Sequence, residues 1–301
     1  MIFALQIGLQ LEFKLLNFSS MNRKVIYNAF FLCLALFACS SKGTEPEPTP
    51  TPSPEPPHTE GVAIFEDHFD TFNSAVWTKE THQAGWTNNE LQSYSPSNVT
   101  VGKDGDRTVL MLTATHKDGK IVSGRVNSKG KMKFGNGTIE ASIKLPRTAN
   151  GLWPAFWMMG NNNKEWPACG EIDIMEMGDA EGIRLGTWGK RVNSALHYGP
   201  TPAGHQQDYY AGDAAYSLQD GQYHTYTLKR NGKTLEVLID LKPFHTFDID
   251  GNSYMQGDFY ALFNLAVGGD FMKIYNAGDV TALKEGEKAV MYIDWIRIFD
   301  K

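Results

Sequence analysis

Short runs of β-branched and aromatic residues, separated by glycine, asparagine, aspartate and proline, recur from residue 61 to residue 301. Such runs favour β-strands, and the residues between them favour turns. Asn231-Gly232 joins two of the runs and is a strong signal for a β-hairpin. Between these bounds, no stretch shows a sustained helical period of apolar residues. The pattern predicts an all-β domain, a two-sheet sandwich or jelly roll, with strands in the runs 108–114, 137–145, 223–229 and 289–299.

The N-terminal segment has the organisation of an export signal. A basic stretch, Met21-Asn-Arg-Lys24, precedes an apolar run over residues 25–38, which is too short to span a membrane comfortably. The run ends in Leu36-Phe-Ala-Cys39, which resembles the bacterial lipobox, so we expect a signal region over residues 1–38 and lipid modification of Cys39. An ordinary signal peptide with a chance cysteine is the alternative. Residues 1–20 precede a plausible start at Met21, and a misassigned start codon would account for them.

Residues 39–60 are rich in proline, threonine, serine and glutamate and cannot bury a core. The prolines favour an extended polyproline conformation, which suits a tether between a lipidated cysteine and a folded domain. No second linker and no repeat interrupts residues 61–301, so we expect one domain over that span. We therefore expect an exported bacterial lipoprotein at the outer membrane or cell surface, which touches the membrane only through its lipid anchor.

Charge and cysteine content exclude several classes of function. The formal net charge is −6 and no run of lysine or arginine stands out, so we expect no nucleic-acid partner. Two of the three cysteines lie in the N-terminal segment, which leaves Cys169 without a disulfide framework or a metal-ligand spacing. We expect a structural role for this thiol rather than a nucleophilic one, because no motif supplies a base to activate it.

Three carboxylates lie within six residues in the run Glu171-Ile-Asp-Ile-Met-Glu176. On a strand, Glu171 and Asp173 share a face, whereas the odd five-residue offset would turn Glu176 to the opposite face. A β-bulge at Ile174 or Met175 supplies the extra residue that returns Glu176 to the shared face. Four effective strand steps then place the two glutamate Cα atoms roughly 13 Å apart. Side chains that lean inward would bring the carboxyl groups to about 5–5.5 Å, the spacing of retaining glycosidases.

Two simpler interpretations of this acidic run remain open at the level of the residues. The acids can form a solvated sheet face, or they can hold a hard cation such as calcium. Neither interpretation explains the aromatic residues upstream, Trp153, Phe156, Trp157 and Trp166. Indole rings stack on the apolar faces of sugars, so their proximity to paired carboxylates indicates polysaccharide processing. Any one of these rings can equally belong to the core.

The segment Trp166-Pro-Ala-Cys-Gly-Glu-Ile-Asp-Ile-Met-Glu176 resembles the signature of glycoside hydrolase family 16 in its bulged form, which is typical of laminarinase-like members. The unbulged form, one residue shorter, is typical of bacillary lichenases and xyloglucan transglycosylases. Further segments resemble the same family in the expected order, so the resemblance covers residues 61–301. These segments are residues 85–92, 123–126, 137–146, 152–159, 196–199, 264–269 and 292–297.

This resemblance implies a β-jelly-roll sandwich of two antiparallel sheets, whose concave sheet forms an open substrate cleft. It implies retaining, endo-acting hydrolysis of a β-linked glucan, with no cofactor required for catalysis. By position, Glu171 would be the nucleophile, Asp173 its assistant and Glu176 the general acid and base. Seven further residues match cleft-lining, substrate-binding positions: Asn89, Glu90, Arg125, Trp153, Trp157, Trp166 and His197.

The resemblance also implies a structural calcium ion on the convex face. Asp294 matches a position that often binds this ion, and oxygens of Glu66 and Gly102 would complete the site. An exposed aspartate on the last strand is the alternative. Residues 270–278 depart from the family pattern, because they lack the proline and tryptophan that laminarinase-like chains often carry there. This departure bears on the fine specificity.

We therefore predict a monomeric, surface-tethered endo-β-glucanase whose partner is a β-glucan polysaccharide. Its substrate is β-1,3-glucan such as laminarin, mixed-linkage β-1,3-1,4-glucan, or both, and the residues alone do not choose between them. A non-catalytic β-glucan-binding protein on the same fold is the alternative, but such a protein would be expected to lose one or both glutamates, and both are present. Action on agar or carrageenan is disfavoured, because the chain has no basic cluster for sulfate.

Overall fold

The computed structural model describes residues 54–300. The expected signal region 1–38, the expected lipidation site Cys39 and the tether up to residue 53 lie outside these described residues. Within residues 54–300, no helix combines the length and apolar character needed to cross a membrane. The all-β prediction is confirmed, because strands build two sheets and the helical elements of this part of the chain are short.

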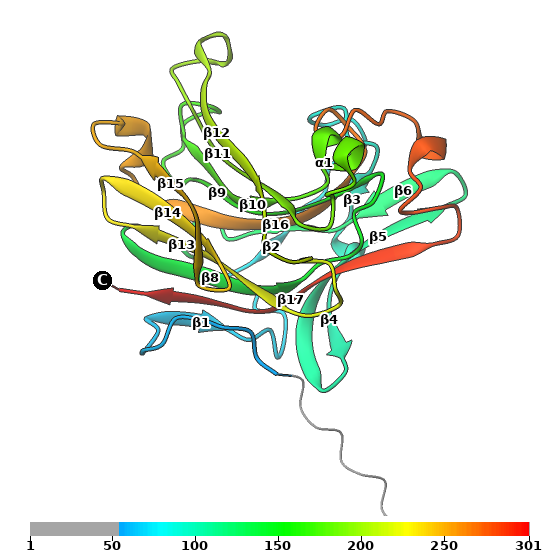
Figure 1. Cartoon of the computed structure of the whole chain (residues 1–301), viewed down its shortest axis with the longest axis horizontal. Coiled ribbons are helices and arrows are strands. Elements are labelled where there is room, and N and C mark those ends of the chain that lie inside the picture. The colour runs from blue at the N-terminus through cyan, green and yellow to red at the C-terminus, as the bar shows by residue number, and fades with distance from the viewer. Residues whose placement is uncertain (1–53, 301) are drawn as a thin grey trace, which may run out of the picture. The chain divides into compact units, whose positions relative to one another are not determined.

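The larger sheet has ten strands and forms the lower layer in Figure 1. Its order across the sheet is β15 (Lys242–Asp248), β14 (Thr234–Ile239), β13 (His224–Arg230), β8 (Gly137–Lys144), β17 (Lys288–Phe299), β5 (Arg107–Lys117), β6 (Lys120–Ser123) and β3 (Ser93–Tyr94). Two more strands join it at the side, β1 (Phe65–Asp67) along β17 and β4 (Val99–Asp104) along β5.

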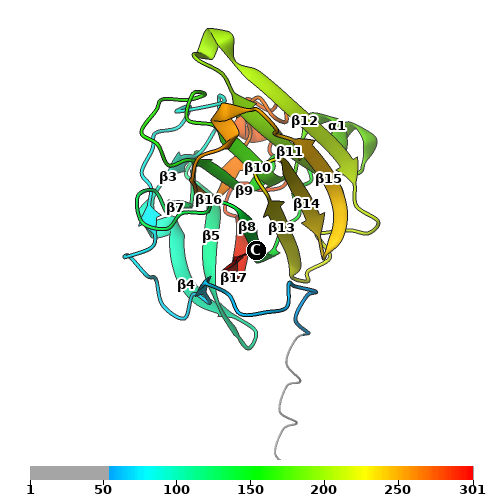
Figure 2. The ribbon, with the colours of Figure 1, turned by 90° about the vertical axis from the view of Figure 1, so that its left-hand side faces the viewer.

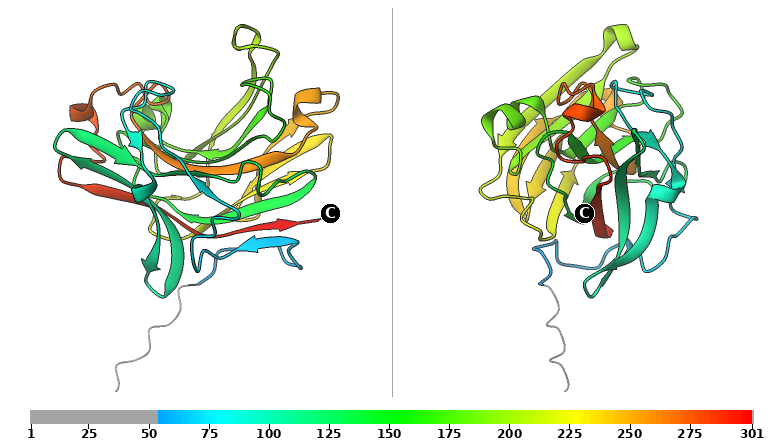
Figure 3. Two further views of the ribbon diagram at one scale, coloured as in Figure 1. Left: turned by 180° about the vertical axis from the view of Figure 1, so that it is seen from behind. Right: turned by 90° about the vertical axis from the view of Figure 1, so that its right-hand side faces the viewer.

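The smaller sheet has seven strands and lies above the first (Figure 1). Its order is β12 (Gln206–Asp213), β11 (Arg191–Tyr198), β10 (Glu171–Glu176), β9 (Leu152–Gly160), β16 (Phe259–Val267), β7 (Arg125–Asn127) and β2 (Thr78–Lys79). Figures 2 and 3 show the two sheets packed as layers from three further sides. The face of the seven-stranded sheet that points away from the other sheet is called the open face below.

The connections contain one α-helix and several 3-10 turns. They are α1 (Ala180–Leu185), η1 (Pro96–Asn98), η2 (Pro202–Gly204), η3 (Ser253–Met255) and η4 (Ala277–Asp279). Asp179 caps α1 at its N-terminus and Gly186, in the left-handed region, ends it. These elements lie in the loops, so they shape the ends of the sheets without interrupting the strand order.

The core lies between the sheets and follows the period of two that strands impose. On β9, Phe156 and Met158 belong to this core, whereas Trp153 and Trp157 belong to small clusters on the open face. The same alternation holds on β16, where Phe263 stacks on Phe156 with ring centroids 4.8 Å apart. The aromatic residues Trp153, Phe156 and Trp157 are therefore divided between the two faces of one central strand.

Two details of pairing refine the sequence prediction. The hairpin expected at Asn231-Gly232 is confirmed, since β13 and β14 pair antiparallel on either side of it and Gly232 has a positive φ. The sheets are antiparallel except at one edge, where β3 pairs in parallel with β6. β3 has only two residues, so this exception adds little to the sheet.

The N-terminal residues 54–60, assigned above to the tether, contact the ten-stranded sheet. The backbone nitrogen and hydroxyl of Thr59 donate hydrogen bonds to the carboxylate of Glu140, which is fully buried on β8. The carbonyl of Pro54 accepts a hydrogen bond from Arg107. Contacts of the chain with the domain therefore begin before residue 61.

Gly178, which follows β10, provides a test of how tightly the seven-stranded sheet is built. Its φ is +101°, and a Cβ atom there would lie 2.1 Å from the carbonyl oxygen of Leu152. We expect Gly178→Ala to lower the free energy of unfolding by about 1–3 kcal/mol, measured from the urea midpoint.

Gly278 is the matched control, because a Cβ atom there meets nothing within 4 Å and its φ is ordinary. We expect Gly278→Ala to leave stability unchanged or to raise it slightly. Equal urea midpoints for the two variants would contradict the close approach at Gly178.

Candidate active site

The acidic run occupies β10, near the middle of the seven-stranded sheet. Its apolar members Ile172, Ile174 and Met175 all belong to the core between the sheets. Its acids therefore share the open face, as the sequence predicts. Opposite them on the flanking strands, Glu171 pairs with Met159 and His197, Asp173 with Trp157 and Ala195, and Glu176 with Ala155 and Asn193.

A β-bulge makes this arrangement possible. The pairing register of β10 shifts between Asp173 and Glu176 against β11, and between Asp173 and Met175 against β9. The shift places the consecutive residues Ile174 and Met175 both in the core, which an unbulged strand cannot do. The hydroxyl of Ser194 donates a 2.9 Å hydrogen bond to the carbonyl of Ile174. The bulge predicted from the five-residue offset is confirmed, and a buried hydroxyl holds it.

Glu176 is held from both flanking strands. The indole nitrogen of Trp153 on β9 donates a 2.9 Å hydrogen bond to its carboxylate, and the Asn193 amide on β11 donates to its backbone carbonyl. Phe271, from the loop that follows β16, stacks on Trp153 with ring centroids 4.4 Å apart. The aromatic pair therefore fixes the direction of the indole N–H toward Glu176.

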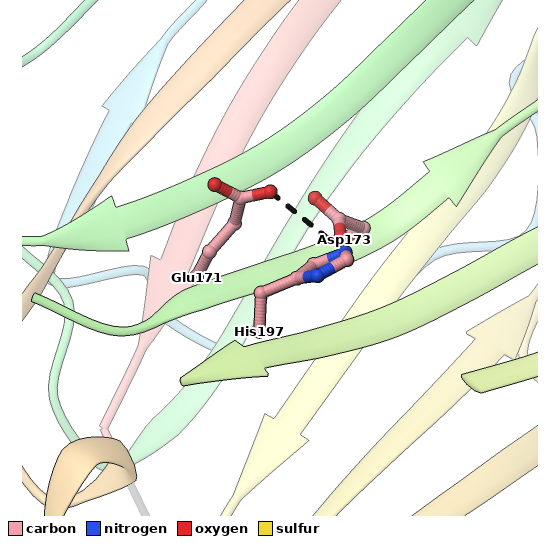
Figure 4. Close-up of side chains that lie close together, drawn as sticks. All are labelled: Glu171, Asp173 and His197. Atoms are coloured by element: carbon pink, nitrogen blue, oxygen red, sulfur yellow. Dashed lines mark ion pairs between the residues drawn. The ribbon is translucent and has the colours of Figure 1, made fainter. Parts of the chain in front are cut away.

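Glu171 and Asp173 converge on the imidazole of His197 (Figure 4). The Nε2 atom of His197 lies 3.2 Å from Asp173 Oδ2 and 4.0 Å from Glu171 Oε1. The Asp173 side chain is almost fully buried, and apart from this contact with His197 its Oδ2 atom has no hydrogen-bond partner among the described residues. His197 is thus the group nearest to both carboxylates that can carry a positive charge.

All three carboxyl groups are hard to ionise in this setting. Burial, together with the charge of Asp173, raises the pKa of Glu171 to about 8. Burial raises the pKa of Asp173 to about 8 and, with the charge of Asp173, raises the pKa of Glu176 well above its ordinary value. His197 and Arg125 act in the opposite direction on the pKa of Glu171. Glu176 is therefore suited to keep a proton, whereas Glu171 has cationic groups that favour its ionised form.

The predicted aromatic residues differ in how far they reach the surface. Trp157 is mostly buried and donates a 2.7 Å hydrogen bond to Asn264 on β16. Trp166 is 38% exposed and lies near His197, with ring centroids 6.3 Å apart. Trp166 is therefore the most accessible of the three predicted tryptophans, and Trp153 and Trp157 form the floor beside the acids.

Arg125 on β7 organises the open face beyond the acids. It forms a 3.0 Å ion pair with Glu80 and lies over Trp157 at 4.7 Å. It also lies near Trp86, whose ring centroid is 5.2 Å from the guanidinium carbon. Trp86 is 50% exposed and stacks on His82 at 3.5 Å. A second accessible indole thus lies at this side of the sheet.

The remaining two predicted substrate residues have separate surroundings. The Asn89 amide donates to the carboxylate of Asp270, and both line a hollow of about 520 Å³ with Tyr275. Glu90 is 6% exposed and accepts hydrogen bonds from Gln92, Tyr94 and Asn88, so its carboxylate belongs to a buried network. Of this pair, Asn89 is the one placed to meet a ligand.

The structural role expected for Cys169 fits its position. Its side chain is 2% exposed, and burial together with the charge of Glu171 raises the pKa of its thiol. A thiol with a raised pKa is a poor nucleophile.

The residues expected to bind calcium have cationic neighbours. Arg107 forms an ion pair with Asp294, and Glu66 lies 3.2 Å from His68. Gly102 lies on β4, two strands from β17. Because Arg107 is paired with Asp294 and Arg297 lies 3.8 Å from the carboxylate of Glu66, the described residues do not form a ready set of oxygen ligands here, and the ion stays a prediction.

The hard-cation alternative for the acidic run has a geometric basis. Glu171, Asp173 and His197 each offer an atom within 4.8 Å of the others. A hard cation prefers oxygen ligands throughout, however, and one of these atoms is an imidazole nitrogen. The set suits proton chemistry better than calcium binding.

Sequence reasoning did not select four residues that the fold brings to this site. Trp86 and Asn264 lie inside segments that carry the family resemblance, and their side-chain types were a usable signal. Phe271 and His205 come from loops. Nothing in their spacing connects them to the acids, and only the return of each loop places them beside Trp153 and His197.

A pair of carboxylic acids on the open face of the sheet, flanked by indoles, is the arrangement that glycoside hydrolases use. Similarities to solved structures and to known proteins identify the family within this class. The chain is 58% identical to the GH16 protein of the Bacteroides ovatus mixed linkage glucan PUL in complex with a G4G4G3G product. That likeness covers 78% of this chain and 100% of the other, with a TM-score of 0.78.

Similarities at lower sequence identity indicate the same family. The laminarinase catalytic domain from Thermotoga maritima is 26% identical, with 80% of this chain and 98% of that chain covered and a TM-score of 0.65. A glucan endo-1,3-beta-glucosidase of Cryptopygus antarcticus is 28% identical over 71% of this chain and 83% of its own length. The family profile "Beta-glucan synthesis-associated protein SKN1/KRE6/Sbg1" matches residues 60–166. The chain belongs to glycoside hydrolase family 16.

The raised pKa of Asp173 predicts a pH-dependent gain in stability when its charge is removed. The folded state binds a proton at Asp173 up to a pH of about 8, whereas the unfolded chain releases it near the ordinary aspartate value of about 3.9. The stability of the wild type is therefore lost as pH rises between these values. We expect Asp173→Asn to melt close to the wild type at pH 4 and roughly several degrees higher at pH 8.

Asp250→Asn is the control for this experiment, since Asp250 is exposed and follows β15, an edge strand of the ten-stranded sheet that does not contain β10. It should leave the difference between the two melting temperatures unchanged. A melting temperature of Asp173→Asn that is lower than that of the wild type at pH 8 would contradict the unfavourable ionisation of Asp173.

Proposed function

We propose that this protein is a retaining endo-β-glucanase that hydrolyses mixed-linkage β-1,3-1,4-glucan. The observation that carries the proposal is the bulge in β10, because it returns Glu176 to the open face that already holds Glu171 and Asp173. Two glutamates on one strand, one favoured as protonated and one with cationic neighbours, are the two groups that a retaining glycosidase needs.

In the first step, Glu176 donates its proton to the glycosidic oxygen while Glu171 attacks the anomeric carbon. The bond to the leaving sugar breaks, and an ester forms between Glu171 and the sugar. In the second step, the ionised Glu176 accepts a proton from water, and the hydroxide attacks the same carbon. The ester breaks and Glu171 leaves as a carboxylate, so the configuration of the sugar is retained.

The neighbours of the two glutamates support these roles. The indole N–H of Trp153 favours the ionised form of Glu176 once the proton has been transferred. The charges of His197 and Arg125 favour the ionised form of Glu171 before attack. Asp173 lies between them on the strand, and its charge opposes the ionisation of both. A proton held by Asp173 therefore allows Glu171 to be the charged member of the pair.

Endo action is supported by the layout of the open face. The acids lie on the third strand from one edge of the seven-stranded sheet, with Trp166 toward that edge and Trp86 and Asn89 toward the other. A polysaccharide can therefore contact aromatic groups on both sides of the bond that breaks. The choice of mixed-linkage glucan over laminarin rests on the 58% identity to a GH16 protein of a mixed linkage glucan PUL.

A non-catalytic β-glucan-binding protein is the alternative function. A binding protein gains nothing from burying three acids whose ionisation is unfavourable. A buried cluster of carboxyl groups with raised pKa values therefore favours the enzyme.

Removal of either glutamate is the direct test of the mechanism. We expect Glu171→Ala and Glu176→Ala each to lower kcat on barley β-glucan by at least roughly 10²-fold. With an activated aryl β-glycoside, azide should rescue both variants. The Glu171→Ala product should be the α-glycosyl azide, and the Glu176→Ala product should be the β-glycosyl azide, because only the latter forms through a glycosyl-enzyme.

Glu236→Gln, on the ten-stranded sheet, is the matched control and should keep wild-type activity. Wild-type rates of release of reducing ends by Glu171→Ala would end the proposed mechanism. The same azide anomer from both active-site variants would refute the assignment of separate roles.

Linkage preference is tested by comparing two polymers under one assay. We expect kcat/KM on barley mixed-linkage glucan to exceed that on laminarin by at least about tenfold, which corresponds to roughly 1.4 kcal/mol of differential transition-state binding. Chromatography of the released oligosaccharides identifies the bond that is cut. Faster hydrolysis of laminarin would reverse the proposed preference while leaving the catalytic assignment intact.

Export, the lipid anchor at Cys39, the structural calcium ion at Asp294 and the monomeric state remain predictions of the sequence.

A further inference from the structure

His197, which faces the acids, contacts a second histidine, His205. His205 follows η2 and precedes β12, and its Nε2 atom lies 2.9 Å from Nδ1 of His197 in a hydrogen bond between the two rings. The ring centroids are 5.1 Å apart with an interplanar angle of 14°. The two imidazoles therefore form a continuous connection from Asp173 through His197 to His205.

The loop between β11 and β12 is built to return His205 to this position. Gly199 has a φ of +134°, and a Cβ atom there would lie 2.3 Å from the carbonyl oxygen of Gly204. The hydroxyl of Thr201 caps η2 by accepting a hydrogen bond from the backbone nitrogen of Gly204. Only glycine permits this close return, so the contact of His205 with His197 follows from the backbone of the loop.

Charged groups surround His197, whereas an aromatic ring covers His205. Glu171 and Asp173 of β10 lie within 4.0 Å of His197, and its charge also acts on Glu176. Arg125 of β7 acts on the same Glu171 carboxylate. On β12, the neighbouring residues Gln206 and Gln207 are uncharged, and Asp208 binds the hydroxyl of Tyr198. Trp166 covers His205 with ring centroids 4.9 Å apart.

The hydrogen bond constrains where the protons of the pair reside. Burial and the charge of His197 lower the pKa of His205, so the His205 ring is neutral at pH 7. A neutral His205 can accept the Nδ1–H of a protonated His197, which leaves the Nε2–H of His197 toward Asp173 and Glu171. When both rings are neutral, the bond can run in either direction. The direction in which His205 donates to Nδ1 leaves the proton of His197 on Nε2, where the N–H faces the carboxylates.

We propose that His205 is a positioning residue, which holds the ring and tautomer of His197 so that a donor and its charge face the nucleophile and its assistant. The proposal rests on the proposed glucanase function. Because His197 opposes the rise in the pKa of Glu171, a His197 that loses this support would leave Glu171 protonated to a higher pH. His205 touches no reacting atom in this scheme, and its effect passes through His197.

The test compares three variants on barley β-glucan over a range of pH. We expect His205→Ala to move the acidic limb of the kcat/KM profile upward by at least about 0.5 pH unit, while kcat/KM at the high-pH side of the optimum stays within about threefold. His205→Gln should restore most of the shift, because its amide can exchange a hydrogen bond with Nδ1. His245→Gln is the control, since His245 stacks on Tyr210 of β12 and its nearest contacts do not include the acids.

A second measurement does not depend on turnover. In the wild type, nitrogen-15 NMR of the imidazoles should show His197 with its proton on Nε2 across neutral and alkaline pH. In His205→Ala the signal should shift toward a mixture of both tautomers, and in His245→Gln it should not change.

The outcomes separate this proposal from the proposed function. A wild type that hydrolyses no β-glucan refutes the function. An active wild type whose acidic limb and His197 tautomer are the same in His205→Ala refutes the positioning role alone. A uniform loss of kcat/KM at every pH with a raised KM and an unchanged tautomer also refutes it, because that result assigns His205 to substrate contact through Trp166.

Discussion

The bulge in β10 is the constraint on which the rest of the site depends. It places two consecutive apolar residues, Ile174 and Met175, in the core and thereby returns Glu176 to the face of Glu171 and Asp173. Core packing and active-site geometry are therefore one requirement, since neither residue can leave the core without turning an acid away from the open face. The buried hydroxyl of Ser194 stabilises this irregular backbone by binding the carbonyl of Ile174.

The same arrangement makes ionisation of the three carboxyl groups unfavourable. Burial raises the pKa of each carboxyl group, and the charge of Asp173 adds to the rise at Glu171 and Glu176, so the folded state holds protons that the unfolded chain would release. These three groups therefore contribute less to stability at neutral and alkaline pH than at acidic pH. The protein gains a pair of groups with different tendencies to ionise. Arg125 and His197 favour the charge of Glu171, whereas the pKa of Glu176 stays well above its ordinary value although His197 also acts on it, so its retained proton suits the role of acid.

Residues from two loops contact the site residues that the strands carry. Phe271 stacks on Trp153, which donates to Glu176, and His205 binds His197, which faces Glu171 and Asp173. Each loop residue acts on the acids through one intermediate side chain. The loop that carries Phe271 is also the segment where the sequence departs from the laminarinase-like pattern. Variation in these loops can therefore adjust either acid without altering the sheet that carries both.

The sequence by itself determined the all-β class, the hairpin at Asn231-Gly232, and the bulge with three acids on one face, because periodicity and offset along one strand are local properties. It did not determine which aromatic rings are accessible. Phe156 belongs to the core, Trp157 is mostly buried and Trp86 is half exposed, since burial depends on what the opposite sheet and the loops cover. The tertiary structure alone brought His205 and Phe271 to the acids, because contacts between loops and distant strands leave no period in the sequence.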